Sequence, residues 1–151
     1  MNEFMQEAIT EAENGIDSGE GGPFGCVIVK DGKIVGRGYN QVVKLKDPTC
    51  HGEMMAIRNA CSRLGTFDLS GCELYTTGEP CPMCLGAIMW ANISKVYYGC
   101  GIEDTEKIGF RDKVFFERAE NGKSEFMSQL GREECLKLYE KYESIKGKKK
   151  Y

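Results

Sequence analysis

Two short motifs, separated by a long interval, are expected to meet in the folded chain. The first, His51 to Glu53, reads H-G-E, and the second, Pro80 to Cys84, reads P-C-P-M-C. The imidazole of His51 and the thiolates of Cys81 and Cys84 supply three of the four ligands of a tetrahedral zinc site. Leaving the fourth position to a reactive water is typical of catalytic zinc. Glu53 follows the only histidine by two residues, so it is placed to carry protons beside the metal without binding it.

The hydrophobic pattern around these motifs predicts helices that alternate with strands. Apolar residues recur at helical spacing over residues 3–18, from His51 to Gly65, and from Cys81 to about Asn92, where Cys81 and Cys84 share one face. The expected strands are Phe24–Lys30, Lys33–Asn40, Glu73–Thr77 and Lys95–Gly99, with Asp31-Gly32 as a hairpin turn. A hairpin followed by two helical crossovers predicts an α/β fold, a three-layer α/β/α sandwich with a central mixed sheet.

Three further segments are predicted from weaker patterns. Residues 41–50 form a polar loop in which Asp47-Pro48-Thr49 favours a turn. Residues 108–112 indicate a loop or a short helix, and residues 133–146 indicate a final helix. The chain has no internal repeat and no linker, so we expect residues 1–151 to form a single domain.

Composition and charge narrow the classes of protein that the chain can represent. The chain has 151 residues, of which 41% are hydrophobic and 28% are charged, as in ordinary globular proteins. No apolar run approaches the roughly 18 residues of a membrane span, and the start lacks the basic and apolar regions of a signal peptide. We therefore expect a cytoplasmic protein without a membrane partner. The net charge of −3 is a poor match for a polyanion, so no nucleic-acid partner is expected.

The eight cysteines leave alternatives to a catalytic zinc site. Four disulfides would suit the even count, but the spacing is irregular and the chain is long enough to fold without them. A redox C-x-x-C pair would leave His51 and Glu53 without a role. A structural zinc site with Cys50 as fourth ligand stays open, although two neighbouring residues at a helix start rarely reach one ion. Most of the remaining cysteines are expected to be small buried hydrophobes: Cys26, Cys61, Cys72, Cys100 and Cys135.

The glycine-rich turn at residues 19–23 resembles a phosphate-binding loop only superficially. It lacks the lysine and hydroxyl residues that follow the glycines of a P-loop. We therefore expect it to serve as a tight entry into the first strand.

H-x-E combined with P-C-x-x-C is the signature of the zinc-dependent nucleobase deaminases. Among these, the chain most resembles the bacterial guanine deaminases of the cytidine deaminase-like superfamily. The resemblance covers residues 20–112 well and 113–146 poorly. It implies a zinc-dependent enzyme that converts a small nucleobase, guanine, to xanthine and ammonia. The matching segments are Gly21–Gly25, Asp47–Thr49, Ala56–Arg58, Leu74–Thr76, Glu79–Ile88, Gly109–Phe110 with Asp112, and the lysine-rich end that closes on Tyr151.

The resemblance also implies roles for residues outside the two motifs. Asn40 corresponds to the purine-binding asparagine of the family, and Phe24 and Trp90 correspond to aromatic walls around the base. Asp112 corresponds to a second acid near the scissile amino group. Tyr151 corresponds to a terminal tyrosine that closes the pocket of a neighbouring subunit. The resemblance therefore implies a homodimer in which a segment of about residues 113–151 is exchanged.

Gly52 leaves the substrate open. Guanine deaminases usually have alanine at this position of the substrate site, whereas fungal-type cytosine deaminases have glycine. Cytosine and amino-purine nucleosides therefore remain alternative substrates. The tRNA adenosine deaminases share the metal site but need a basic RNA-binding face, and an inactive relative would keep the zinc ligands without needing Glu53.

Overall fold

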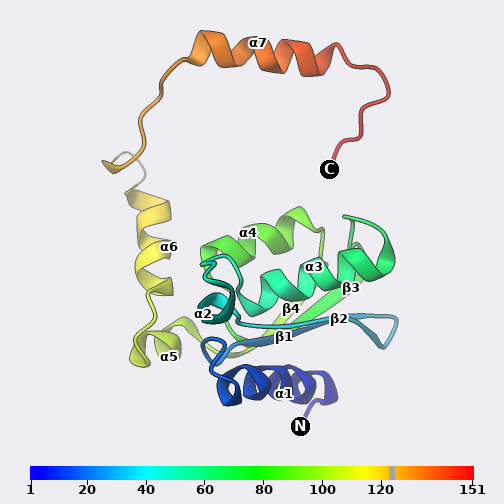
Figure 1. The fold of residues 1–151 in the computed structure, drawn as a ribbon, viewed down its shortest axis with the longest axis vertical. Coiled ribbons are helices and arrows are strands. Elements are labelled where there is room, and N and C mark those ends of the chain that lie inside the picture. Colours follow the sequence, from blue (N-terminus) through cyan, green and yellow to red (C-terminus); the bar gives the residue numbers. More distant parts are fainter. Residues whose placement is uncertain (123–124) are drawn as a thin grey trace.

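The computed structural model describes residues 1–122 and 125–151. Its elements form an α/β body followed by helices that extend away from it (Figure 1). In chain order they are α1 (Glu3–Asp17), β1 (Gly25–Lys30), β2 (Lys33–Tyr39), α2 (Val42–Leu45), α3 (Gly52–Leu64), β3 (Cys72–Gly78), α4 (Pro82–Trp90), β4 (Lys95–Cys100), α5 (Ile102–Lys107), α6 (Asp112–Asn121) and α7 (Arg132–Glu143).

The four strands within the described residues form one mixed sheet in the order β2-β1-β3-β4. β1 pairs antiparallel with both β2 and β3, and β3 pairs parallel with β4. The hairpin between β1 and β2 turns at Asp31 and Gly32, whose φ angles are 49° and 72°. Positive φ at both central residues is the requirement of a type I′ turn, so the Asp-Gly prediction is confirmed.

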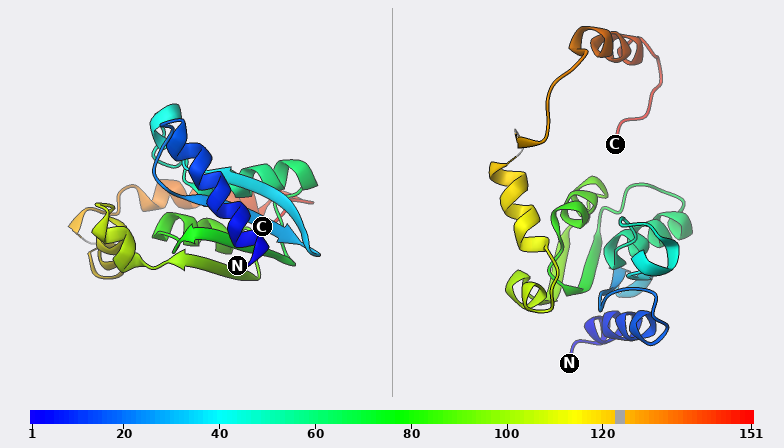
Figure 2. Two further views of the ribbon diagram at one scale, coloured as in Figure 1. Left: turned by 90° about the horizontal axis from the view of Figure 1, so that it is seen from below. Right: turned by 60° about the vertical axis from the view of Figure 1, so that its left-hand side comes forward.

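Helices cover both faces of the sheet, which confirms the predicted three-layer sandwich (Figures 1 and 2). Alternate residues of β1 divide between two cores, because successive strand side chains point to opposite faces. Val27 and Val29 pack with Ala8 of α1 on one face. Cys26 and Ile28 belong to the opposite core, which also contains residues of α3 and α4.

Two glycines of β2 allow α3 to approach the sheet closely. A Cβ atom on Gly36 would lie 2.7 Å from the carbonyl oxygen of Ala56, and one on Gly38 would lie 2.4 Å from the Ala56 nitrogen. Any side chain at these positions would push α3 outward. The position of α3 against the sheet, and with it that of His51 and Glu53 at its start, therefore depends on this contact.

The structure corrects several details of the sequence predictions. The loop at residues 41–50 contains the four-residue helix α2. Residues 108–111 form the expected loop, but it lies between the helices α5 and α6, and Asp112 already belongs to α6. His51 and Cys81 precede α3 and α4 as N-cap residues instead of lying inside them. All eight cysteines are free, which excludes the disulfide alternative, but Cys100 and Cys135 are exposed instead of buried. No helix in the described part of the chain is long and apolar enough to cross a membrane.

Helix α6 packs against α4 and α5, whereas α7 lies apart from the α/β body. Figure 1 and the right-hand view of Figure 2 show α6 rising beside the body and α7 lying apart from the sheet. The predicted final helix is present as α7, and its apolar residues Leu138 and Tyr139 are exposed. After α7 the tail turns back, and the Tyr151 ring lies 5.7 Å from the Trp90 ring, measured between centroids.

Candidate active site

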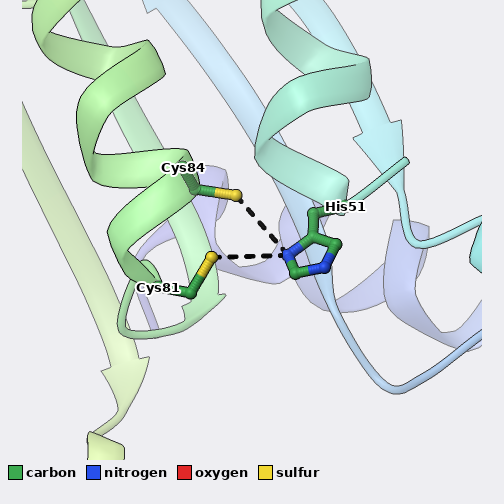
Figure 3. A group of neighbouring side chains, drawn as sticks. All are labelled: His51, Cys81 and Cys84. Carbon is green, nitrogen blue, oxygen red and sulfur yellow. Dashed lines mark hydrogen bonds between the residues drawn. The ribbon is translucent and has the colours of Figure 1, made fainter. Parts of the chain in front are cut away.

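Three candidate metal ligands meet where the N-termini of α3 and α4 face each other (Figure 3). His51 is the N-cap of α3 and Cys81 is the N-cap of α4, with Cys84 one turn further along α4. Both cysteine side chains point toward the His51 ring. The positive ends of the helix dipoles favour thiolates at this position. The two distant motifs therefore come together as the sequence predicted.

The distances between the donor atoms suit a tetrahedral zinc ion. The Nδ1 atom of His51 lies 3.6 Å from Cys81 Sγ and 3.6 Å from Cys84 Sγ. Bonds of about 2.3 Å to sulfur and about 2.0–2.1 Å to nitrogen at a tetrahedral angle separate sulfur from nitrogen by about 3.6 Å. Among the described residues, the ligand atoms of this group all lie within 4.8 Å of one another, and Cys50 is not a member. Cys50 Sγ instead accepts a hydrogen bond from Arg58 Nη1 at 3.7 Å.

The charge of the two sulfurs also favours a cation. Hydrogen bonding to Cys84 lowers the pKa of Cys81 to about 4, and His51 adds to this effect. Hydrogen bonding to Cys81, together with burial, raises the pKa of Cys84. The two thiols by themselves therefore favour a single thiolate. A divalent cation stabilises both in the deprotonated form, as a zinc site with one imidazole and two thiolates requires.

Glu53 lies beside the candidate ligands without being one of them. Its side chain is buried, with 4% of the residue exposed, and it lines the cavity in front of the ligands. Thr76 Oγ1 on β3 donates a hydrogen bond of 2.8 Å to Glu53 Oε1. Glu53 thus occupies the position expected of a proton carrier.

A cavity of about 480 Å³ opens onto the candidate metal ligands. This volume lies within the range of small-molecule sites, roughly 300–1,000 Å³. The cavity brings together most of the residues expected from the sequence, which come from segments far apart in the chain. Those expected residues are Phe24, Asn40, His51, Glu53, Cys81 and Asp112.

Asn40 is oriented by the backbone of α2. Its side-chain Oδ1 accepts a hydrogen bond of 3.1 Å from the backbone N–H of Val42. The backbone N–H of Asn40 donates to the carbonyl oxygen of Phe24 at 2.9 Å. With Oδ1 engaged, the side-chain amide nitrogen is the group left to donate to a ligand. Asn40 is buried and lines the cavity, so it suits recognition of a hydrogen-bond acceptor.

Phe24 forms one wall of the cavity together with Phe110. Their ring centroids are 4.9 Å apart at an interplanar angle of 82°, an edge-to-face arrangement. Gly52 lies behind this wall, since a Cβ atom there would be 3.0 Å from the carbonyl oxygen of Phe24. Gly52 is therefore not among the residues that line the cavity, and the Phe24 backbone lies between them.

Asp112 begins α6 at the cavity and is partly buried. Burial raises its pKa, and the nearby Cys81 adds to this shift, whereas His51 opposes it. Asp112 and Glu53 line the same cavity, and the role of Asp112 as a second acid stays a prediction.

Trp90 and Tyr151 lie outside this cavity in the single chain. Trp90 is 66% exposed and Tyr151 is 77% exposed, and they line a separate surface hollow with Gly86, Met89 and Asn92. Their expected contacts with the substrate are therefore not made within one chain. Closure by a neighbouring subunit stays a prediction.

Sequence reasoning missed several apolar residues that line the cavity. Val42 and Val43 belong to α2, Phe110 lies between α5 and α6, and Phe115 belongs to α6. The apolar residues Val42, Val43 and Leu45 were the available signal within this loop, and they do not by themselves predict a helix. Phe110 was part of the resemblance, but no role was assigned to it.

The family model described as the cytidine and deoxycytidylate deaminase zinc-binding region matches residues 1–100. Guanine deaminase of Bacillus subtilis (strain 168) is 42% identical over 151 residues, covering 98% of this chain and 97% of that protein. The X-ray structure of guanine deaminase from Bacillus subtilis superposes with a TM-score of 0.93 at 41% identity, covering 100% of this chain and 99% of that one.

Two further relatives match a shorter part of the chain. The tRNA-specific adenosine deaminase of Aquifex aeolicus (strain VF5) is 48% identical over 95 residues, covering 63% of this chain and 62% of that protein. A structure of guanine deaminase from Nitrosomonas europaea has a TM-score of 0.68 at 32% identity, covering 71% of this chain and 62% of that one. The metal ligands, the carboxylate beside them and these matches agree, and the chain belongs to the zinc deaminase family that is defined by the cytidine and deoxycytidylate deaminase zinc-binding region.

Proposed function

We propose that the chain hydrolyses guanine to xanthine and ammonia. The observation that carries this proposal is the match to Bacillus subtilis guanine deaminase, which runs through 98% of the chain. The match to the Aquifex aeolicus tRNA-specific adenosine deaminase is limited to 63% of the chain. The shared part supports deaminase chemistry, and the full-length likeness supports guanine as the base.

His51, Cys81 and Cys84 would hold the zinc ion. When bound, zinc supplies a water molecule whose pKa is lowered toward about 7. Glu53, as the buried carboxylate next to these ligands, would take up the proton that the water loses and pass it to a ring nitrogen of the base. It then helps to protonate the amino group as it leaves as ammonia. One molecule of water is consumed for each ammonia released.

The remaining cavity residues orient the base. The free amide nitrogen of Asn40 donates to an acceptor on the edge of the purine, and the Phe24 and Phe110 rings offer an apolar wall to its face. Asp112 lies on the same cavity and supports the amino group. Together these residues present the carbon that bears the amino group to the nucleophile.

We also propose that two copies of the chain form a homodimer by exchanging their C-terminal segments, about residues 113–151. Helix α7 lies apart from the sheet, with Leu138 63% exposed and Tyr139 71% exposed. An isolated helix of this length gains little stability without tertiary packing. In the proposed dimer, each Tyr151 closes the cavity of the other subunit.

A substrate panel tests the proposal directly. The purified protein is assayed for ammonia release from guanine, guanosine, cytosine, isocytosine, adenosine and a tRNA that carries an anticodon adenosine. We expect the highest kcat/KM for guanine, with an ultraviolet spectrum that changes to that of xanthine. Faster turnover of cytosine or of the tRNA would contradict the proposal. Zinc binding without ammonia from any substrate would identify an inactive relative.

A further inference from the structure

A single polar residue interrupts the apolar face of β3. Cys72, Leu74 and Thr76 alternate along the strand and so point to the same face of the sheet. Cys72 and Leu74 belong to the core beneath α3 and α4. Thr76 continues this row at the end nearest the cavity and is fully buried, with 0% exposed. A buried hydroxyl is unfavourable unless it is hydrogen-bonded, so its partners indicate why it is there.

The Thr76 hydroxyl lies between two acceptors. Oγ1 is 2.8 Å from Glu53 Oε1 and 3.1 Å from the carbonyl oxygen of Gly78. A hydroxyl has one proton to donate, and a charged carboxylate is the stronger acceptor. The shorter distance agrees with donation to Glu53. The bond joins a rigid central strand to a side chain near the start of α3, which fixes the carboxylate from outside its own helix.

This bond distinguishes the two oxygens of the carboxylate. Oε1 is engaged by Thr76, which leaves Oε2 as the oxygen available for proton exchange in the cavity that Glu53 lines. A proton on Oε2 leaves Oε1 able to accept the Thr76 hydrogen bond, so the bond survives each proton transfer. The carboxylate therefore need not rotate between taking up a proton and delivering it.

We propose that Thr76 is a positioning residue for the reaction: its hydroxyl holds Glu53 Oε1, so that Oε2 exchanges protons with the water, the base and the leaving ammonia. This inference rests on the proposed deaminase function. It predicts that loss of the hydroxyl lowers kcat while the affinity for the base and for zinc is kept, since Thr76 does not line the cavity.

The test compares Thr76→Val, which keeps the shape, with Thr76→Ser, which keeps the hydroxyl. We expect Thr76→Val to lower kcat for guanine about 10- to 100-fold, as for a lost hydrogen bond to a charged group, with KM changed by less than about threefold. Thr76→Ser should return kcat to within about threefold of the parent, and both variants should bind one zinc ion per chain. Ser94→Ala is the matched control, because the Ser94 hydroxyl donates only to the backbone, to Cys72 O at 2.8 Å. It should lower the thermal midpoint and leave kcat unchanged.

Two results would overturn the role of Thr76: a parent-like kcat in Thr76→Val, or an equal loss of kcat in the Val and Ser variants. If Thr76→Val does not fold, Thr76→Ala replaces it, and a kcat equal to that of Thr76→Ser would likewise overturn the role. Failure of the proposed function is distinct, because the parent protein itself would then release no ammonia from guanine.

Discussion

At the scale of single residues, Glu53 is proposed to carry the chemistry that separates a deaminase from a protein that only binds zinc. Replacement by glutamine keeps the shape and the hydrogen bond from Thr76 but removes the ability to carry a proton. General acid–base groups contribute about 10²–10⁴-fold, and we expect a loss at the upper end because Glu53 acts in several steps. Steady-state kinetics on guanine measure the loss, with zinc content and thermal midpoint as controls. Activity within tenfold of the parent would exclude the proton-carrier role.

Substitution of Cys84 tests the metal site. Its sulfur is fully buried and 3.6 Å from His51 Nδ1, so serine at this position replaces a soft thiolate ligand with a hydroxyl. We expect one zinc per chain in the parent and a large loss of zinc from Cys84→Ser, measured by elemental analysis after dialysis. Cys50→Ser is the matched control, because Cys50 adjoins His51 but bonds to Arg58, and it should keep its zinc. Full zinc occupancy in Cys84→Ser would remove the ligand assignment.

At the scale of elements, the contact between β2 and α3 determines the position of α3, which carries His51 and Glu53 at its start. A Cβ atom on Gly38 would lie 2.4 Å from Ala56 N and 2.6 Å from Gly52 O, both of them backbone atoms. Neither can move unless α3 moves, so Gly38→Ala should shift α3 and with it Glu53. We expect a loss in the free energy of unfolding of about 1–3 kcal/mol or more, with reduced kcat, measured by denaturant titration at fixed protein concentration.

The matched control for Gly38 is Gly101→Ala. There a Cβ atom would meet only the Glu79 and Asp104 side chains, at 3.8 Å and 4.0 Å, and φ is −80°. This substitution should change stability much less. Equal stability of the Gly38→Ala variant and the parent would show that α3 tolerates displacement.

Prediction from sequence worked best where a local pattern has one structural solution. Asp31-Gly32 predicted the position of the hairpin turn, because few pairs of adjacent residues can both adopt a positive φ angle. The H-x-E and C-x-x-C spacings identified the metal ligands because only a few residue types bind zinc. Helix α2 was missed because four residues carry no measurable helical period, and it forms against the Glu20 carbonyl, which accepts from the amides of Val43 and Lys44. Such a contact is invisible until the chain is folded.

At the scale of the whole molecule, the described single chain leaves apolar surface uncovered. Met89 and Trp90 on α4 are exposed, and so are Leu138 and Tyr139 on α7. Removing apolar surface from water is favourable in free energy. An exchanged dimer would remove these surfaces from water in both copies. The sequence could indicate the terminal Tyr151 as a functional residue only by resemblance, because the contact that it is proposed to make belongs to a second chain.

Deletion of residues 147–151 tests whether the tail contributes to the site. In the single chain, Tyr151 packs near Trp90 and Phe67, with ring centroids 5.7 Å and 6.1 Å away, and outside the cavity that holds Glu53. If it closes the cavity of a partner, the deletion should lower kcat/KM for guanine and leave zinc content unchanged, because water is then no longer excluded during turnover. Unchanged kinetics, or a fully active monomer in sedimentation, would leave the tail as solvated surface.

Complementation decides whether the tail acts within its own chain or on its partner. Glu53→Gln lacks the proton carrier but keeps the tail, whereas the chain truncated after Lys146 keeps Glu53 but lacks Tyr151. When the two are co-expressed, an exchanged heterodimer contains one site with the Glu53 of the truncated chain and the Tyr151 of the other. Random assortment makes half of the dimers mixed, each with one complete site of two, so about a quarter of the parent activity should return. Without exchange, every site lacks either its carboxylate or its tyrosine, and activity above the sum of the two separate variants is not expected. Recovery of activity in the mixture would therefore establish that Tyr151 serves the neighbouring subunit.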